Sequence, residues 1–130
     1  MLKEFRRPWL WLGLWLLAVA VVAAMSLGTP PPTPQVTHLD KVQHLGVYLV
    51  LAAGAVQVFR PGRALLGAAV VLVAVGGGLE VLQGALTENR MMDVRDALAN
   101  TLGVLLGAGT ARWRVRDLLL RVENPTAPGP

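Results

Sequence analysis

The sequence has no cysteine and few charged residues. Its 130 residues include no Cys, and Asp, Glu, Lys and Arg together make up 15%. The missing cysteines exclude disulfide bonds, thiolate chemistry and zinc sites built on cysteine. Hydrophobic residues make up 54% and mean hydropathy is +0.53, both high for a soluble protein of this size. The composition therefore predicts a single all-α membrane domain over residues 1–130.

Four long apolar segments account for this hydrophobicity. A helix needs roughly 20 mainly apolar residues to cross the hydrocarbon core of a bilayer. The predicted spans cover about residues 9–27, 42–59, 64–86 and 96–113. The fourth is the shortest, so it requires snorkelling arginines or a locally thinner bilayer. We therefore predict a bundle of four transmembrane helices, followed by a short tail at 114–130.

Basic residues are unevenly divided between the connecting segments. Of the 12 Lys and Arg residues, Lys41, Arg90 and Arg95 lie on one predicted side and the rest on the other. The positive-inside rule then places both termini in the cytoplasm and the loops 28–41 and 87–96 outside. Because these charges flank apolar runs, they indicate topology and lipid headgroup contacts, and no nucleic-acid partner is expected.

The first apolar segment has a second interpretation. A basic start, an apolar run and small residues near its end are also typical of a cleaved secretory signal. The run is longer than the usual signal core, and Trp9, Trp11 and Trp15 are typical of an interfacial anchor. An uncleaved span is therefore the favoured prediction.

Polar residues gather at one end of the predicted bundle. Within each span they are three or four residues apart, so they share one helical face. Since consecutive spans run in opposite directions, all of these residues fall at the outer end. We predict that they form an outward-facing polar pocket. Its members are Asp40, Lys41, His44, Tyr48, Glu80, Gln83, Arg90, Asp93, Asp96 and Asn100.

Several of these residues have a structural explanation when taken alone. His44 could bond a carbonyl group at the interface, Tyr48 could belong to an aromatic belt, and Asp96 is expected to cap the fourth helix. Glu80 differs, because a charged residue within a span costs about 2.5–3.5 kcal/mol and is by default functional. We expect Glu80 to face inward and to have a polar partner. The available partners are Lys41, Arg90, His44 and Asn100.

Small residues lie next to the polar residues of two predicted helices. Gly103 and Gly107 follow Asn100 at intervals that make a small-xxx-small pattern. Three consecutive glycines, 76–78, precede Glu80. Such stripes allow helix backbones to approach closely, so we predict tight helix contacts beneath the polar residues.

The ordered polar spacing also resembles a known family. Asp40-Lys41-x-x-His44-x-x-x-Tyr48, Glu80-x-x-Gln83 and Arg90-x-x-Asp93-x-x-Asp96-x-x-x-Asn100-Thr101-Leu102-Gly103-x-x-x-Gly107 are similar to the pattern of the VanZ-like family. Those are small bacterial membrane proteins, the founding one associated with resistance to glycopeptide antibiotics such as teicoplanin. The resemblance covers about residues 40–107. It implies a multi-pass protein of the bacterial cytoplasmic (inner) membrane with a role at the cell envelope, and no particular reaction.

Binding is the favoured function for the predicted pocket. Its ligand would be the polar headgroup of an envelope lipid, such as a lipid-linked cell-wall precursor, or an amphiphilic lipoglycopeptide antibiotic. Lys41 and Arg90 would pair with phosphate or carboxylate, and Glu80, Gln83 and Asn100 would bond amides or sugar hydroxyls. Membrane lipids are the other expected partners, and no cofactor is expected.

Three alternatives remain open. In an intramembrane hydrolase or transferase, His44 would be the general base and Glu80 or Asp96 would orient it, although no Ser or Cys nucleophile accompanies them. A divalent cation could be held by Asp40, His44, Glu80 and Asp93 or Asp96, but no recognised metal motif is present, and we predict no metal. A proton-coupled transporter could use Glu80 and His44, but no inverted repeat is visible.

Overall fold

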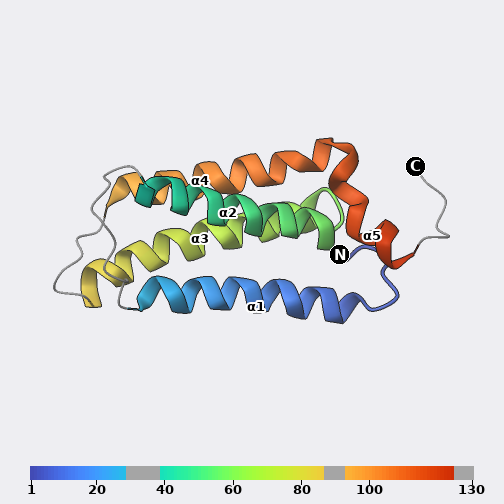
Figure 1. Ribbon diagram of the computed structural model, residues 1–130, viewed down its shortest axis with the longest axis horizontal. Coiled ribbons are helices and arrows are strands. Elements are labelled where there is room, and N and C mark those ends of the chain that lie inside the picture. Colours follow the sequence, from blue (N-terminus) through green and yellow to red (C-terminus); the bar gives the residue numbers. More distant parts are fainter. Residues whose placement is uncertain (29–38, 87–92, 125–130) are drawn as a thin grey trace.

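Four long helices run side by side along the molecule (Figure 1). The computed structural model describes residues 1–28, 39–86 and 93–124. The predicted all-α class is confirmed. The long helices are α1 (Pro8–Leu27), α2 (Leu39–Val58), α3 (Arg63–Leu86) and α4 (Val94–Gly109). Three short helices follow: η1 (Thr110–Arg112), η2 (Arg114–Asp117) and α5 (Leu118–Glu123).

The bundle has two chemically different ends. Met1 and Asn124, the first and last described residues, lie at one end with α5, and we call this the terminal end (Figure 1). The other end holds the start of α2, the last turns of α3 and the start of α4, and we call it the polar end. Of the predicted pocket members, Arg90 lies outside the described residues, as do most residues of the two predicted outer loops.

Among the described residues, three helices are long and apolar enough to cross a membrane. They are Pro8–Leu27, Asp40–Val58 and Arg63–Ala85. Helix α4 has 16 residues, which corresponds to about 24 Å against a hydrocarbon core of roughly 30 Å. It ends at Gly109 and not near 113, because the chain there tightens into η1, with the Thr110 hydroxyl donating to the Gly107 carbonyl at 2.7 Å. The fourth predicted span is therefore shorter than the sequence pattern indicates.

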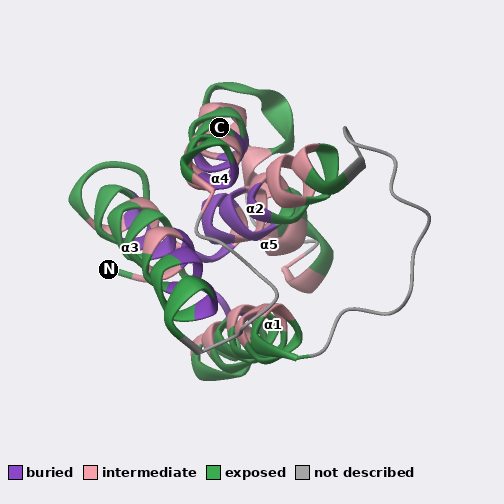
Figure 2. Ribbon diagram, turned by 90° about the vertical axis from the view of Figure 1, so that its left-hand side faces the viewer, coloured by how far each residue is buried: buried purple, intermediate pink, exposed green. Residues whose placement is uncertain are grey.

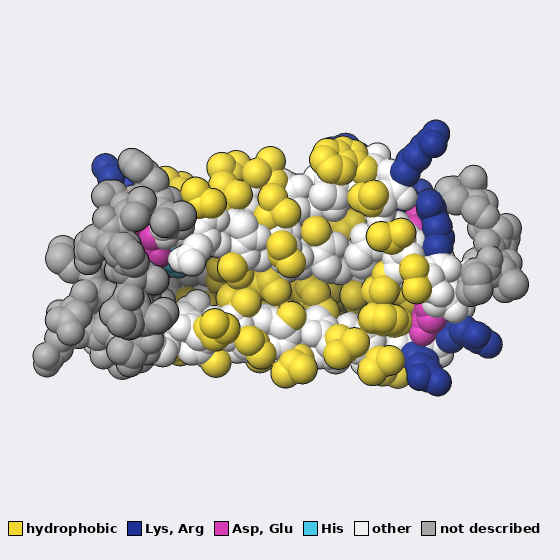
Figure 3. Space-filling model, viewed as in Figure 1, with side chains coloured by type: hydrophobic (Ala, Val, Ile, Leu, Met, Phe, Trp, Pro, Cys, Tyr) yellow, Lys and Arg dark blue, Asp and Glu magenta, His cyan; other side chains and the backbone are white. Residues whose placement is uncertain are grey.

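Apolar side chains cover the outside of the bundle. Leu17, Val70 and Leu105 are all exposed, and they lie on three different helices. Figure 3 shows these hydrophobic side chains over the middle of the molecule, with Lys and Arg gathered at the terminal end. Buried residues face inward from α2, α3 and α4 (Figure 2). A long apolar surface between charged ends is the pattern of a protein surrounded by lipid.

Helices α2 and α4 approach most closely along the predicted glycine stripe. A Cβ atom at Gly103 would clash with the Leu45 carbonyl oxygen, and one at Gly107 would clash with that of Leu49. At Gly76 of α3, a Cβ would lie 3.1 Å from the Tyr48 ring. The predicted close contacts are therefore confirmed. Gly77 and Gly78, by contrast, face open space within the described part of the chain.

Helix α1 is attached to α2 by a buried tryptophan. Trp15 donates its indole N–H to the Leu51 carbonyl at 2.9 Å, and its ring meets Phe59 edge-on at 5.1 Å between centroids. The interfacial role expected for Trp15 is wrong, since the side chain is buried in the core. Trp9, two turns earlier, is exposed as the prediction required.

The terminal end is closed by a buried lysine. Lys3 is 6% exposed, and its Nζ lies 2.9 Å from Asp117 Oδ1 and donates also to the Arg116 carbonyl. Its backbone N–H donates to the Val58 carbonyl at 3.0 Å. Burial opposes ionisation of Asp117, but the hydrogen bonds from Lys3 and Arg116 outweigh it and lower the pKa of Asp117. Lys3 thus joins the N-terminal segment to η2.

Replacing Lys3 by methionine is expected to destabilise the terminal end. Methionine fills the same space but leaves Asp117 without one charged hydrogen bond, a loss of about 2 kcal/mol. Because the pKa of Asp117 is lowered in the folded protein, this contribution is fully present above the ordinary aspartate pKa and is lost as pH falls from there through the lowered pKa of the folded state. The free energy of unfolding of the native protein and of Lys3→Met, measured in mixed micelles at pH 7 and at pH 3, gives the loss of stability and its dependence on pH. Equal losses at the two pH values would contradict the ion pair's role.

Candidate functional site

The outermost layer of the polar end is an ion-pair bridge between α2 and α4. Lys41 Nζ lies 2.9 Å from Asp93 Oδ2 and 2.8 Å from Asp96 Oδ1. The hydrogen bond from Lys41, with a second from the Arg95 backbone, lowers the pKa of Asp93 below its usual range. Asp93 therefore stays ionised well into the acid range, and the bridge fixes the starts of the two helices against each other.

The cap of α4 is Asp93 and not Asp96. Asp93 has extended backbone angles, and its Oδ1 accepts from the Arg95 N–H at 2.8 Å. The prediction that Asp96 caps this helix is wrong, because the helix starts two residues earlier than expected. Asp96 lies in the first turn instead, where its buried carboxylate pairs with Lys41.

One turn deeper, His44 is the point where three helices meet. Its Nδ1 lies 3.1 Å from Asn100 Oδ1 on α4 and 3.6 Å from Glu80 Oε1 on α3. Its Nε2 lies 3.8 Å from Asp40 Oδ1, one turn back along α2. Since Asn100 presents its carbonyl oxygen, Nδ1 is the hydrogen-bond donor, and Nε2 remains toward the exposed side.

Glu80 and Asn100 are buried to a degree that is unusual for such residues. Their exposed fractions are 4% and 2%. A buried carboxylate requires polar partners, and His44 is one of those that Glu80 has here. The expectation that Glu80 turns inward toward a polar partner matches its burial beside His44 of α2.

Tyr48 and Gln83, also predicted pocket members, serve as links between helices. Tyr48 is buried in the core, where its ring packs over Gly76 and its Cβ faces Gly103. Gln83 is buried and donates to the Ser26 carbonyl at the end of α1 at 2.5 Å. No sequence signal pointed to Ser26, because the contact uses a backbone oxygen that any residue would supply.

Three groups of the polar end have the chemistry of metal ligands. One oxygen each of Asp40 and Asp96 and one ring nitrogen of His44 lie within 4.8 Å of one another. The Lys41 ammonium already lies against Asp96 at 2.8 Å. A divalent cation would therefore compete with Lys41 for the Asp96 carboxylate.

The described part of the polar end holds two groups that could act as acid and base, next to a threonine whose hydroxyl is engaged. His44 and Glu80 could exchange a proton with a bound group. The nearby hydroxyl of Thr101 donates to the Ala97 carbonyl of its own helix at 2.8 Å, as helical threonines commonly do. The Thr101 hydroxyl is therefore poorly placed to act as a nucleophile.

Comparison with known proteins identifies the family. The VanZ/LLP1 family model matches residues 29–116, a range that includes all ten predicted site residues. No curated protein and no solved structure matches the chain. The resemblance inferred from the polar spacing is thereby confirmed, and with the candidate spans it makes this a multi-pass membrane protein. The chain belongs to the VanZ/LLP1 family.

Proposed function

We propose that the protein spans the bacterial cytoplasmic membrane four times and binds, at its outer side, the polar headgroup of an envelope lipid or an amphiphilic antibiotic. The observation that carries the proposal is the meeting of buried Glu80 and Asn100 at His44, from three separate helices. Keeping a carboxylate and a carboxamide at membrane depth is costly, and a bound ligand is a reason for retaining them.

The charges at the polar end favour a particular kind of headgroup. Lys41 is held by two carboxylates, so it is not free to pair with phosphate. The described acids there are Asp40, Glu80, Asp93 and Asp96, and the described bases are Lys41 and Arg95. A surface with surplus carboxylates attracts ammonium groups and accepts hydrogen bonds from hydroxyls. Amino sugars and amine-bearing glycopeptides have this chemistry.

Binding of an amine-bearing lipoglycopeptide tests the proposal directly. Asp40 is exposed, so Asp40→Asn should leave the fold intact while removing one charge from the polar end. We expect affinity for teicoplanin to fall about tenfold, corresponding to roughly 1.4 kcal/mol for a charged hydrogen bond. Calorimetry with the detergent-solubilised protein would measure it.

Glu4→Gln is the matched control for this experiment. Glu4 is an exposed carboxylate at the terminal end, so its removal changes net charge equally without touching the polar end. The two variants should therefore differ. Equal affinities in the native protein and both variants would remove the support for an outward ligand site near Asp40.

An enzymatic role is the second candidate. The 3.6 Å separation of His44 Nδ1 and Glu80 Oε1 favours an acid–base pair acting on a lipid-linked substrate, with a hydrolase or transferase reaction. Turnover of a lipid-linked precursor by the purified protein, lost in His44→Gln, would support this function over simple binding.

Membrane orientation is tested by cysteine labelling. The native chain has no cysteine, so single replacements report without background. We expect Thr33→Cys and Glu88→Cys to react with an impermeant reagent added to whole cells, because the positive-inside rule places both loops outside. Gly62→Cys and Gly129→Cys should react only after the membrane is opened. The reverse pattern would place the polar end in the cytoplasm.

A further inference from the structure

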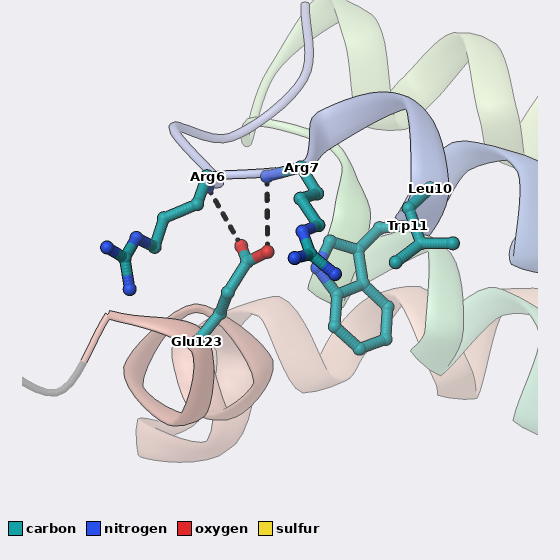
Figure 4. A pocket seen from close by; sticks show the side chains of 5 residues that line it. All are labelled: Arg6, Arg7, Leu10, Trp11 and Glu123. Carbon is teal, nitrogen blue, oxygen red and sulfur yellow. Dashed lines mark hydrogen bonds between the residues drawn. The ribbon is translucent and has the colours of Figure 1, made fainter.

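A pocket lies at the terminal end of the bundle, at the opposite end from His44, Glu80 and Asn100. It has a volume of about 490 Å³ and is lined by Arg6, Arg7, Leu10, Trp11 and Glu123. Figure 4 shows the Glu123 carboxylate between the two arginine side chains. Both Glu123 oxygens accept from backbone, from the N–H of Arg6 at 3.0 Å and of Arg7 at 3.1 Å. This carboxylate therefore takes the place of a side-chain cap at the start of α1.

The arginine side chains remain available to a ligand. Neither guanidinium group has a hydrogen bond or ion pair within the described residues, since only backbone atoms of Arg6 and Arg7 contact Glu123. Two positive charges against one negative charge leave the pocket with a net charge of about +1, which favours an anion. The indole Nε1 of Trp11 is buried and has no acceptor in the described part of the chain. A phosphate oxygen would accept from the two guanidinium groups, beside the buried indole of Trp11.

An apolar stripe continues from this pocket along α1. Leu10 lines the pocket, and Leu14, Leu17 and Val21 follow at helical spacing, all four exposed. They form one face of the helix, directed outward where the bilayer would be. A ligand with a charged head and a hydrocarbon chain matches both parts, whereas a free phosphate ion matches only the first.

We propose that this pocket, at the start of α1, binds the phosphodiester headgroup of an anionic phospholipid, with one acyl chain lying along Leu10, Leu14 and Leu17. The site is separate from the polar end and does not depend on the function assigned there. It would hold a structural or regulatory lipid in the leaflet that surrounds the terminal end.

Native mass spectrometry of the protein taken from bilayers with equal amounts of phosphatidylglycerol and phosphatidylcholine tests this site. We expect the native protein to retain phosphatidylglycerol preferentially. In Arg6→Gln/Arg7→Gln that preference should fall at least about tenfold, since both guanidinium groups that would donate charge-assisted hydrogen bonds to the phosphodiester are removed. The double variant should still fold, because the Glu123 contacts use backbone N–H groups.

Arg63→Gln/Arg112→Gln is the matched control. It removes two exposed charges at the same end of the bundle, outside the pocket. Lipid preference should be unchanged in this variant, and an excess of inorganic phosphate should not displace the bound lipid. If both double variants lost the preference for phosphatidylglycerol equally, the preference would come from general surface charge, and the proposed site would be overturned. Displacement by inorganic phosphate would overturn the role of the acyl chain.

Discussion

Gly103→Leu is expected to abolish most of the folded protein. A Cβ at this position would clash with the Leu45 carbonyl oxygen and lie 3.0 Å from the Leu49 nitrogen, both backbone atoms of α2. Backbone within a packed helix cannot turn aside as the end of a side chain can, so α2 and α4 must separate. Overpacking typically costs 1–3 kcal/mol, and a clash with backbone should cost about 3 kcal/mol or more. That is a large part of the stability of a small domain.

Gly78→Leu provides the control for this prediction. Gly78 is exposed on α3, and an added Cβ meets nothing within 4 Å among the described residues. The same substitution should therefore be harmless there, and leucine should even favour the helix by about 1 kcal/mol over glycine. The amount of monodisperse protein in detergent measures how much of each variant folds. Similar yields of Gly103→Leu and Gly78→Leu would show that the α2–α4 contact is not tight.

The glycine stripe and the polar convergence could both be predicted from the sequence for the same reason. Helical periodicity is a local property, so residues three or four apart must share a face whatever surrounds them. Alternating span direction then places His44, Glu80 and Asn100 at one depth. The sequence could not tell which glycines of 76–78 make contact, because that depends on how α3 is rotated against its neighbours. Only Gly76 faces Tyr48 and Asn100.

Other features depend on packing between distant segments. The charge pattern explains Lys3 as a topology signal, yet the folded chain buries it against Asp117, which lies more than 100 residues further along the sequence. The observed cap at Asp93 and the observed end of α4 at Gly109 differ by only a few residues from the positions predicted from the sequence. Aspartate side chains cap equally well at neighbouring positions, so composition does not choose between Asp93 and Asp96. The folded structure distinguishes them, because Asp93 accepts from the Arg95 N–H whereas Asp96 is buried within the first turn of α4.

Glu80→Gln is expected to abolish the cellular function while the protein stays folded in the membrane. Glutamine keeps the shape and can still hydrogen-bond, but it removes the charge 3.6 Å from His44 Nδ1. Removing a charge from a span eases insertion by up to roughly 2–3 kcal/mol, so the protein level should not fall. Binding of an ammonium-bearing headgroup, or proton exchange with His44, would be lost. Growth in the presence of a lipoglycopeptide such as teicoplanin measures the protection that the proposed function implies. Immunoblots of membranes measure the amount of protein.

Two other outcomes of the Glu80 experiment are informative. If Glu80→Gln kept full protection at normal protein level, the carboxylate would be neither base nor ligand nor counter-ion, and both proposed functions would fail together. If protection and protein level fell in parallel, the pairing of Glu80 would be structural, like the contacts of Gly103. Glu4→Gln controls for the loss of a carboxylate, since Glu4 is exposed and lies at the terminal end. We expect protection to be lost in Glu80→Gln alone, because only that carboxylate is buried among the polar groups of three helices.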